Sequence, residues 1–380
     1  MWRAMTRADV IVVGGGIAGL AVAYHLTSRG VRRVVLLERE PLLASHSSGR
    51  NAAIFRPLDS SPDIVTLAKR SHALLDALFE SEPDHWLRST GLLLAAPEAT
   101  LLTDLAALAR DFEVPHEAMG PEEIVALVPL LAGGQALRGL YLPGAGVMDI
   151  HAITTRLARV AKAAGAQLLT GMGVRSVRAQ RGQVNGVELA NGDVVFGDLV
   201  VIAGGAWAAQ LGASCGAGLP LTPLRRHLVQ LESPEKVSDM TPAVWRLGDE
   251  VYFRAESGGI LASPCDEKPW PAESPSPDQR TIERLAKKLT HLAPALAASA
   301  VRHAWACLRT VAPDRALVAG EDPRVRGLFW LAGLGGHGMT IGVAAGEVVA
   351  ALISGLDHPM AFALTPSRLL ATAPPGSMRS

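Results

Sequence analysis

The sequence has 380 residues, of which 49% are hydrophobic, and its 36 basic and 36 acidic side chains give a formal net charge of zero. A chain of this length can form two domains around sizeable apolar cores. The balanced charge argues against nucleic acid and against an anionic membrane surface as binding partners. No metal site is expected, because the cysteines are far apart and lack the spacing of zinc ligands or of a disulfide framework: Cys215, Cys265 and Cys307.

The first residues do not resemble a secretory signal, because residues 1–7 lead directly into an apolar strand that a glycine motif interrupts. No ungapped apolar segment reaches the length of about 20 residues that a membrane-spanning helix needs. We therefore expect a cytoplasmic protein without a transmembrane segment. Peripheral attachment to the inner face of the membrane is an open alternative, and the number of subunits is open as well.

The first predicted strand, residues 10–13, runs into a glycine-rich turn and a helix. The motif G-x-G-x-x-G is formed by Gly14, Gly16 and Gly19. A second predicted strand, residues 34–37, ends at Glu38, which follows the first glycine by 24 residues (38 − 14). In such a motif the glycines allow a tight turn, a close approach of backbone N–H groups to phosphate and packing of helix on strand, while the carboxylate binds ribose. The pattern predicts a dinucleotide site, for NAD or FAD.

Further elements follow in chain order. We predict a buried strand at 91–95, helices at 98–110 and from Pro121, a helix at 151–164 that Gly165 ends, and a strand at 166–169. A small β-meander is predicted over 174–189, with turns at Asn185–Gly186 and Asn191–Gly192. The buried strand at 199–202 then runs into a second glycine turn.

Residues 219–308 differ in character, because strands alternate there with proline-rich loops. Strands at 228–231, 250–253 and 259–261 suggest an antiparallel sheet, followed by a loop at 264–277 and a helix at 281–292. The last block, 328–355, returns to strand, glycine loop and helix. A second helix N-terminus of this kind suits the negative charge of a reduced flavin, so FAD is favoured over NAD.

With these motifs the sequence resembles the superfamily of FAD-dependent D-amino-acid oxidases, sarcosine oxidases and glycine oxidases, and within it the bacterial D-arginine dehydrogenases. The resemblance extends from about residue 9 to residue 364. It is carried by the opening motif with Glu38, the terminal glycine loop and the segments 46–53, 200–207, 223–226 and 304–309.

The resemblance implies an α/β fold of two domains, a Rossmann-like (GR2-type) FAD-binding domain and an antiparallel β-rich substrate domain. The FAD-binding domain is expected to be discontinuous, over 1–88, 147–216 and 308–368. The substrate domain is expected over 89–146 and 217–307.

The resemblance also implies a set of FAD-binding residues. The opening motif supplies Gly14, Gly16, Ile17, Ala18, Gly19, Glu38 and Arg39, and the loop after it supplies Ser47, Ser48, Arg50, Asn51 and Ala52. Further contacts come from Val174, whose backbone would meet adenine, and from Ala203, Gly204 and Trp207. The terminal loop supplies Gly335, Gly336, His337, Gly338, Met339 and Thr340. The alternatives are a polar surface loop around residue 50 and a core position for Trp207.

Three residues correspond to those that hold the substrate carboxylate in D-arginine dehydrogenases: Arg226, Tyr252 and Arg309. A planar guanidinium can donate two parallel hydrogen bonds to a carboxylate. The alternative for Arg309 is a structural ion pair, for example with Asp314. For Arg226 the alternative is that neighbouring Arg225 faces the site instead, because side chains alternate along a strand.

The implied reaction is hydride transfer from the substrate Cα to flavin N5, giving an imino acid that water hydrolyses. His337 is a candidate for assisting proton loss, with an ordinary loop histidine as the alternative. Cys307 lies two residues before Arg309, the spacing at which sarcosine oxidases carry covalent flavin, although non-covalent FAD beside a buried thiol is favoured. The electron acceptor is open between oxygen and quinone.

Departures from the D-arginine dehydrogenase pattern bear on the substrate. The acid that would pair with a guanidinium has no counterpart in the stretch Ser89–Leu93, the active-site histidine is replaced by Ile54, and the lid tyrosine falls near Asp59. A buried cation without a partner would cost several kcal/mol. We therefore predict oxidation of a neutral D-amino acid or a small secondary amino acid. The alternatives are a 2-hydroxy acid or polyol-phosphate dehydrogenase, and a flavin-binding subunit of a multi-component amino-acid dehydrogenase.

Overall fold

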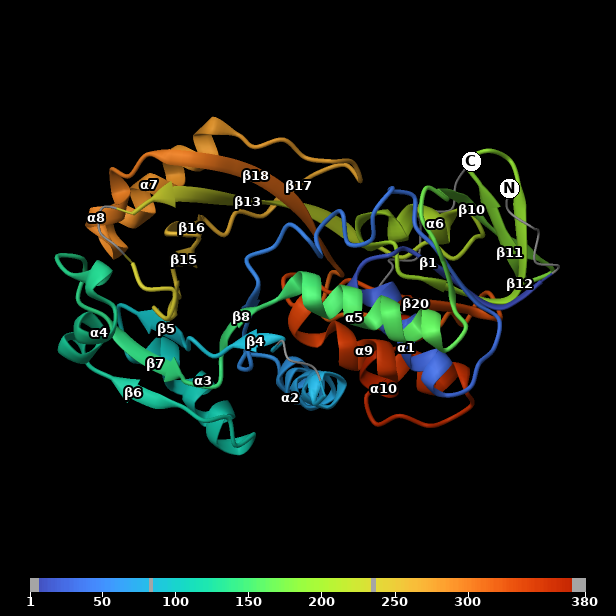
Figure 1. The fold of residues 1–380 in the computed structure, drawn as a ribbon, viewed down its shortest axis with the longest axis horizontal. Helices are drawn as coiled ribbons and strands as arrows, with labels where there is room; N and C mark the ends of the chain where they lie inside the picture. Colours follow the sequence, from blue (N-terminus) through green and yellow to red (C-terminus); the bar gives the residue numbers. More distant parts are fainter. Residues whose placement is uncertain (1–6, 82–84, 234–236, 371–380) are drawn as a thin grey trace.

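A computed structural model describes residues 7–81, 85–233 and 237–370, so the predicted lead-in to the first strand lies almost entirely outside the described residues. Two large β-sheets form the two lobes of the molecule (Figure 1), and a small three-stranded sheet lies between them. The predicted α/β class is therefore confirmed. Among the described residues, no helix combines the length and the apolar character needed to cross a membrane.

The first large sheet has a parallel centre of five strands in the order β9-β2-β1-β12-β20. Antiparallel strands extend it at both β12 and β20. Its strands are β1 (Ala8–Val13), β2 (Val34–Leu37), β9 (Gln167–Leu169), β10 (Val174–Gln180), β11 (Gln183–Leu189), β12 (Val194–Ile202), β19 (Val318–Glu321) and β20 (Leu328–Ala332).

Residues of β1 alternate between two apolar cores, as a strand covered on both faces requires. Val10 and Val12 pack against the helices, whereas Ile11 and Val13 pack against the β-meander. The helices on the first face are α1 (Ile17–Ser28), α2 (Pro62–Phe79), α5 (Ile150–Ala163) and α9 (Gly338–Ile353). On the other face lie strands β10 and β11 and helix α6 (Ala208–Ala213).

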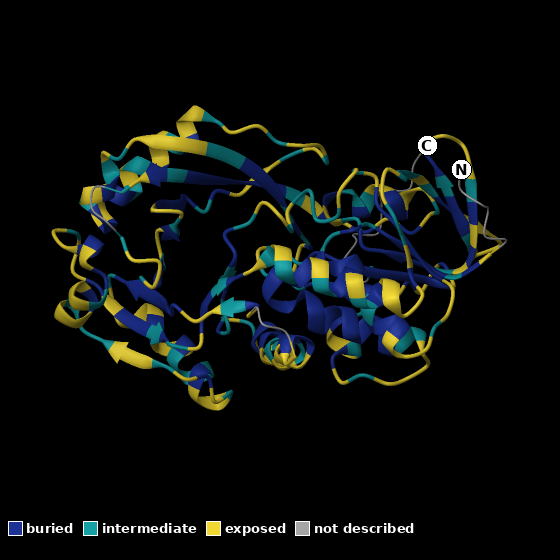
Figure 2. Ribbon diagram, viewed as in Figure 1, coloured by how far each residue is buried: buried dark blue, intermediate teal, exposed yellow. Residues whose placement is uncertain are grey.

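Helix α9 is apolar on almost all sides because α1 and α2 both pack against it. Figure 2 shows it buried within its lobe. The contact with α1 is close, since a Cβ on Gly346 would lie 2.5 Å from the Cβ of Ala21. Helix α1 begins at the opening glycine motif and helix α9 at the terminal glycine loop. Their packing therefore fixes the distance between these two turns.

The second large sheet has the strand order β17-β13-β16-β15-β14-β5-β7-β6, with β18 paired to β13. Its strands are β5 (Leu92–Ala96), β6 (Glu117–Met119), β7 (Arg138–Leu142), β13 (Thr222–Glu232), β14 (Ala243–Arg246), β15 (Val251–Glu256), β16 (Gly259–Ser263), β17 (Lys268–Pro269) and β18 (Val301–Val311). Outer helices are α3 (Thr100–Asp111), α4 (Pro121–Leu127), α7 (Gln279–Leu292) and α8 (Pro294–Ala297).

The small sheet consists of β3 (Ile54–Phe55), β8 (Gly146–Met148) and β4 (Leu87–Arg88) in the order β3-β8-β4. The short helix α10 (Ala361–Leu364) closes the described fold. One predicted turn is wrong: β11 runs straight through Asn185–Gly186. The chain reverses instead at Arg181 and Gly182, which both have left-handed backbones, with φ of 51° and 74°. The proposed domain boundaries stay a prediction.

Candidate active site

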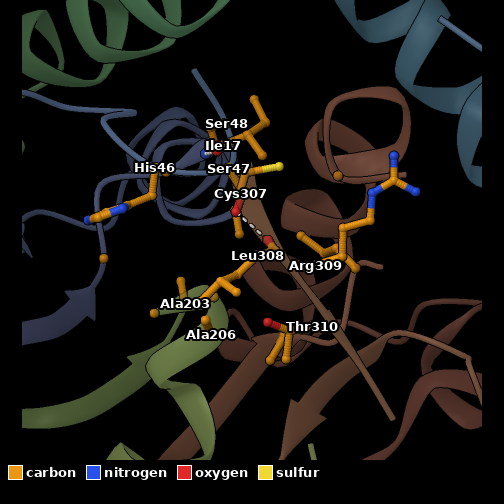
Figure 3. Close-up of a pocket in the computed structure, with 18 of the residues that line it drawn as sticks. Ile17, His46, Ser47, Ser48, Ala203, Ala206, Cys307, Leu308, Arg309 and Thr310 are labelled. Atoms are coloured by element: carbon orange, nitrogen blue, oxygen red, sulfur yellow. Dashed lines mark hydrogen bonds between the residues drawn. The ribbon is translucent and has the colours of Figure 1, made fainter. Parts of the chain in front are cut away.

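A cavity of about 300 Å³ draws on both large sheets and on the loops that join them. Its walls come from the turn after β1, the loop at 44–54, the turn after β12, strand β18 and the loop before α9. Residues from most of these segments appear together in Figure 3. The cavity therefore lies where the opening glycine motif and the terminal glycine loop meet the β-rich lobe.

The opening glycine turn is shaped by two close backbone approaches. Gly14 has a left-handed backbone with φ of 115°, and a Cβ there would lie 2.5 Å from the Ala203 carbonyl oxygen. A Cβ on Gly19 would overlap the carbonyl oxygen of Gly14, so Gly19 serves the packing of helix on strand and does not line the cavity. The first N–H groups of α1 have no partner within the helix, and that of Ile17 donates to Ser48 Oγ at 3.0 Å.

Glu38 lies at the end of β2 and lines the cavity. Its Oε2 accepts the N–H of Gly15 at 2.6 Å and its Oε1 accepts that of Glu40 at 2.9 Å, which fixes the orientation of the carboxylate. Arg39 places its guanidinium 3.7 Å from the ring centroid of Trp207. Trp207 is half-buried and lines the cavity, so it is not a core residue.

The loop at 44–54 is fixed by its own polar side chains. Ser47 Oγ donates to the Leu308 carbonyl oxygen and so ties the loop to β18 (Figure 3). Asn51 Nδ2 donates to the Ser48 carbonyl oxygen at 2.7 Å, and its Oδ1 accepts the N–H of Ala53 at 2.6 Å. Arg50 is exposed and lines a smaller crevice beside the cavity. The loop is thus ordered, and only Arg50 among its predicted residues lies outside the cavity wall.

The second glycine loop brings backbone close to a guanidinium. A Cβ on Gly336 would lie 2.5 Å from Nη1 of Arg309, so only glycine leaves room for that side chain. His337 is the N-cap residue just before α9, and its neighbours Gly336 and Gly338 line the cavity while His337 does not. Burial lowers the pKa of His337 to about 4, against a smaller opposing effect of Asp59, whose Oδ2 lies 3.6 Å from Nε2. The imidazole is therefore neutral near pH 7.

Arg309 lies on β18 and lines the cavity without an acidic partner among the described residues. Asp314, which the sequence suggested as an ion-pair partner of Arg309, instead binds Arg368 at 2.7 Å. Burial, followed by the charge of Arg226, lowers the pKa of Arg309. A cation in this position is stabilised by an anionic ligand.

Arg226 is on the same face of the sheet as Arg309, because residue 226 pairs with residue 307 and residue 224 with residue 309. It lies behind the cavity wall, with 3% of its surface exposed. Its Nη2 donates to Glu267 Oε1 at 3.0 Å, whereas its Nε and Nη1 have no hydrogen-bond partner in the described chain. Arg225 points to the opposite face, where it binds Asp278 at 3.2 Å, so it does not replace Arg226.

Tyr252 of β15 lines the cavity and is 1% exposed. Its hydroxyl forms no hydrogen bond of normal geometry within the described segments, although Ser263 faces it across the pairing of β15 with β16. Burial raises the pKa of Tyr252 above its usual range, so the hydroxyl remains a donor. Its ring packs 4.6 Å from that of Trp245.

The structure brings most of the predicted site residues to one cavity. Those that line it are Gly14, Gly16, Ile17, Ala18, Glu38, Arg39, Ser47, Ser48, Asn51, Ala52, Val174, Ala203, Gly204, Trp207, Tyr252, Arg309, Gly335, Gly336, Gly338, Met339 and Thr340. Sequence reasoning missed other lining residues, among them His46, Arg175, Leu228, Trp245 and Thr310. Leu228 and Trp245 carried no usable signal, because an apolar residue on a strand reads as core.

The residues present fit a bound flavin dinucleotide. A Cβ would come within 2.5 Å of a neighbouring atom at Gly14 in the opening turn and at Gly336 in the terminal loop, and these two turns place two helix N-termini at one cavity. These features define a dinucleotide-dependent oxidoreductase. The family of FAD dependent oxidoreductases named DAO matches residues 9–352, so the chain belongs to that family and FAD is its cofactor.

Several similar curated proteins are named for small amino acids, and one is named as a regulatory subunit. The chain is 29% identical to glycine oxidase of Geobacillus kaustophilus, over 96% of this chain and 97% of that one. It is 27% identical to mitochondrial sarcosine dehydrogenase of Homo sapiens (91% and 39%) and 30% identical to the regulatory subunit of pyruvate dehydrogenase phosphatase of Mus musculus (90% and 41%). The chain thus spans about two fifths of the length of the first curated relatives it matches.

Among solved structures, L-proline dehydrogenase from P. horikoshii superposes with a TM-score of 0.86 at 25% identity, covering 96% of this chain and 98% of that one. Glycine oxidase from Geobacillus kaustophilus gives a TM-score of 0.80 at 26% identity, covering 93% and 96%. The two-domain flavoprotein fold is therefore confirmed. The expected likeness to D-arginine dehydrogenases stays a prediction.

Proposed function

We propose that this chain oxidises the C–N bond of a neutral amino acid, either a small secondary amino acid or a neutral D-amino acid. One observation carries the proposal: at the same cavity the Tyr252 hydroxyl is a buried donor without an acceptor, and Arg309 has no acidic partner among the described residues. A substrate carboxylate would accept from both groups, and a buried donor without an acceptor is costly. Behind them, Arg226 adds positive charge to the same region.

The lining next to Tyr252 is apolar. Ile54, Leu228 and Trp245 line the cavity there and pack in one cluster with Tyr252. Three acids lie near these walls without lining the cavity: Asp59 binds Arg56 at 3.2 Å, Glu267 binds Arg226, and Glu250 accepts the indole N–H of Trp245 at 2.5 Å. A neutral, small side chain fits walls of this kind.

Bound FAD supplies a hydride acceptor. The residues of the chain then have the tasks of binding and orientation: Arg309 and Tyr252 hold the carboxylate, which positions the neighbouring Cα. His337 stays neutral near pH 7 and lies directly behind the cavity wall, so it is a candidate acceptor for the amine proton through an intervening group. Apolar residues exclude water until the imino acid leaves.

The names of the relatives support a small substrate, because they refer to glycine, sarcosine, dimethylglycine and L-proline. A preference for D-amino acids rests on the resemblance described from the sequence alone. One relative is named as a regulatory subunit, which supports the second candidate, a flavin-binding subunit whose chemistry resides in a partner. The cytoplasmic location and the acceptor, oxygen or quinone, belong to the proposal as well.

Anaerobic reduction of the flavin tests the proposal. The FAD-loaded protein is mixed with sarcosine, with glycine, with both enantiomers of proline, methionine and arginine, and with the 2-hydroxy acids lactate and 2-hydroxyglutarate. Bleaching is followed by absorbance. We expect sarcosine or one neutral amino acid to bleach the flavin fastest, with re-oxidation by air or a quinone analogue identifying the acceptor. A lead for D-arginine would contradict the proposal, bleaching only by 2-hydroxy acids would favour the hydroxy-acid alternative, and no bleaching would favour the subunit.

Acid precipitation tests the attachment of the flavin. Burial raises the pKa of the Cys307 thiol, so it is a poor nucleophile despite its place on the cavity wall. We therefore expect non-covalent FAD and a yellow supernatant. Colour retained in the pellet would show a covalent link at Cys307.

A further inference from the structure

An ion pair lies directly behind the apolar wall of the cavity. Arg56 Nη2 binds Asp59 Oδ2 at 3.2 Å, and both side chains are largely buried, with 14% and 13% of their surface exposed. The Arg56 guanidinium lies 4.7 Å from the ring centroid of Trp245, and its Nε donates to the Leu58 carbonyl oxygen at 3.0 Å. Neither charged residue lines the cavity, but Trp245, whose ring Arg56 contacts, does.

The charges of Arg56 and Asp59 cancel each other. Burial alone would raise the pKa of Asp59, but Arg56 and then His337 outweigh it, and the pKa lies below its usual value. Asp59 is therefore ionised near pH 7, and its charge is matched by Arg56 while His337 is uncharged. Loss of either partner would leave a net charge behind the wall.

We propose that the pair Arg56–Asp59 determines which side-chain charge the cavity accepts. Arg56 supplies beside Asp59 the positive charge that would otherwise be left for a cationic substrate side chain, and Asp59 in turn cancels a cation that would attract an acidic side chain. The cavity is thereby kept selective for neutral side chains. This inference rests on the proposed function, because it requires that Arg309 holds the carboxylate of the same ligand.

Removing one charge of the pair should have the opposite effect from removing the other. Removing the charge of Arg56 leaves Asp59 negative, which favours a cationic ligand; removing the charge of Asp59 leaves Arg56 positive, which favours an anionic one. For charges about 8 Å apart in a partly screened interior, the Coulomb energy corresponds to a change in affinity of about tenfold or more. A purely structural role for the pair would weaken all ligands alike.

Ligand binding to the FAD-loaded protein tests this without turnover. The probes are three carboxylates of equal carbon number: pentanoate, 5-aminopentanoate and glutarate. Isothermal titration calorimetry gives their Kd values for the wild type, R56M, D59N, the double variant R56M/D59N and R56K. The control is D314N, which removes the charge of an ion pair outside the cavity wall.

In R56M we expect the affinity of 5-aminopentanoate relative to pentanoate to rise about tenfold, and in D59N the affinity of glutarate relative to pentanoate to rise by a similar factor. R56K, R56M/D59N and D314N should keep the ratios of the wild type within about threefold. Unchanged ratios in both single variants would overturn the inference, and because the two variants shift opposite ratios, either one suffices if the other does not fold.

The outcome for pentanoate separates this inference from the function on which it rests. If the wild type binds pentanoate and R309M does not, the carboxylate site stands and the ratios decide the role of Arg56 and Asp59. Failure of the wild type to bind pentanoate would overturn the carboxylate site itself, and the inference with it.

Discussion

At the scale of single residues, Arg309 and Gly336 depend on each other. The guanidinium fills the space that a side chain at residue 336 would need, and no acid among the described residues neutralises it. Asp314, five positions further along, binds Arg368 instead. The charge of Arg309 is therefore held for a ligand, which makes this position the most direct test of the site.

Two substitutions of Arg309 should impair substrate binding to different degrees. Arg309→Met removes charge and both hydrogen bonds, and we expect kcat/KM for the preferred amino acid to fall about 100-fold or more. Arg309→Lys keeps the charge but loses the second hydrogen bond, so a fall of about tenfold is expected. Steady-state kinetics measures both, with FAD content as a control; equal activity of the Met variant and the wild type would contradict the assignment.

His25 predicts how stability depends on pH. It is 4% exposed, contacts the Val343 carbonyl oxygen at 3.0 Å, and burial lowers its pKa from 6.5 to about 4, against an opposing effect of Glu347. His25 therefore binds a proton more readily in the unfolded state than in the folded state. The contribution of neutral His25 to stability is present above pH 6.5 and is lost as the pH falls towards 4. At pH 5 the loss amounts to about 2 kcal/mol.

Urea unfolding at pH 7.5 and pH 5 checks this expectation. His25→Gln keeps a donor for the Val343 carbonyl oxygen and does not titrate, so its loss of stability between the two pH values should be smaller than that of the wild type. His337 shifts in the same direction, which is why the comparison with the variant is needed. An equal pH dependence of the two proteins would assign the effect to other groups.

At the scale of elements, the crossing of α1 and α9 sets the spacing of the two glycine turns. Gly346 lies at the crossing, and a Cβ there would approach the Ala21 Cβ to 2.5 Å and its backbone carbonyl carbon to 2.8 Å. Backbone cannot rotate out of the way, so the helices themselves must move apart. Both helix N-termini would then shift relative to the cofactor.

Gly346→Ala should therefore lower stability and weaken FAD binding together. We expect a loss of about 1–3 kcal/mol, as for other overpacked cores, and a higher Kd for FAD. Thermal unfolding and quenching of flavin fluorescence measure the two effects. Gly144→Ala is the matched control, because a Cβ there meets open space; the same loss in both variants would argue against the crossing as the cause.

Elements with a local signal were predictable from the sequence. The unit β1–α1–β2 follows from its glycine spacing and its apolar runs, and α9 from the terminal glycine loop. Helix α2 was missed, although Pro62 at its start and apolar residues at helical spacing carried a signal. The turn at Arg181 was missed because Asn185–Gly186 has the stronger turn chemistry, and strand pairing overrides it.

At the scale of the whole molecule, the cavity exists only because distant segments meet. Ser47 and Leu308 are joined by a hydrogen bond across 261 positions, and the glycine motif explains only one part of the lining. The sequence therefore predicted the cofactor and the position of Arg309 at the cavity, each of which has a motif. It could not predict Trp245, the pairing of Arg226 with Glu267, or the neutralisation of Asp59 by Arg56, because these depend on tertiary contacts.

Removal of FAD should destabilise both lobes at once, since the cavity draws on both large sheets. At a free FAD concentration of 100 times its Kd, we expect about 3 kcal/mol of added stability over the apoprotein. Thermal unfolding in a titration with FAD measures this, with NAD as the control ligand. A shift in Tm with NAD and none with FAD would contradict the choice of cofactor.

The spacing of residues along strand β18 limits which changes of sequence this protein tolerates. Cys307 and Arg309 face the cavity from alternate positions, while the intervening Leu308 holds the loop of Ser47 through its carbonyl oxygen. A one-residue insertion or deletion before Arg309 would turn each side chain to the opposite face of the sheet. New substrates are therefore accessible by point substitutions on the apolar wall, whereas length changes within residues 305–309 should be absent from any active descendant, natural or designed.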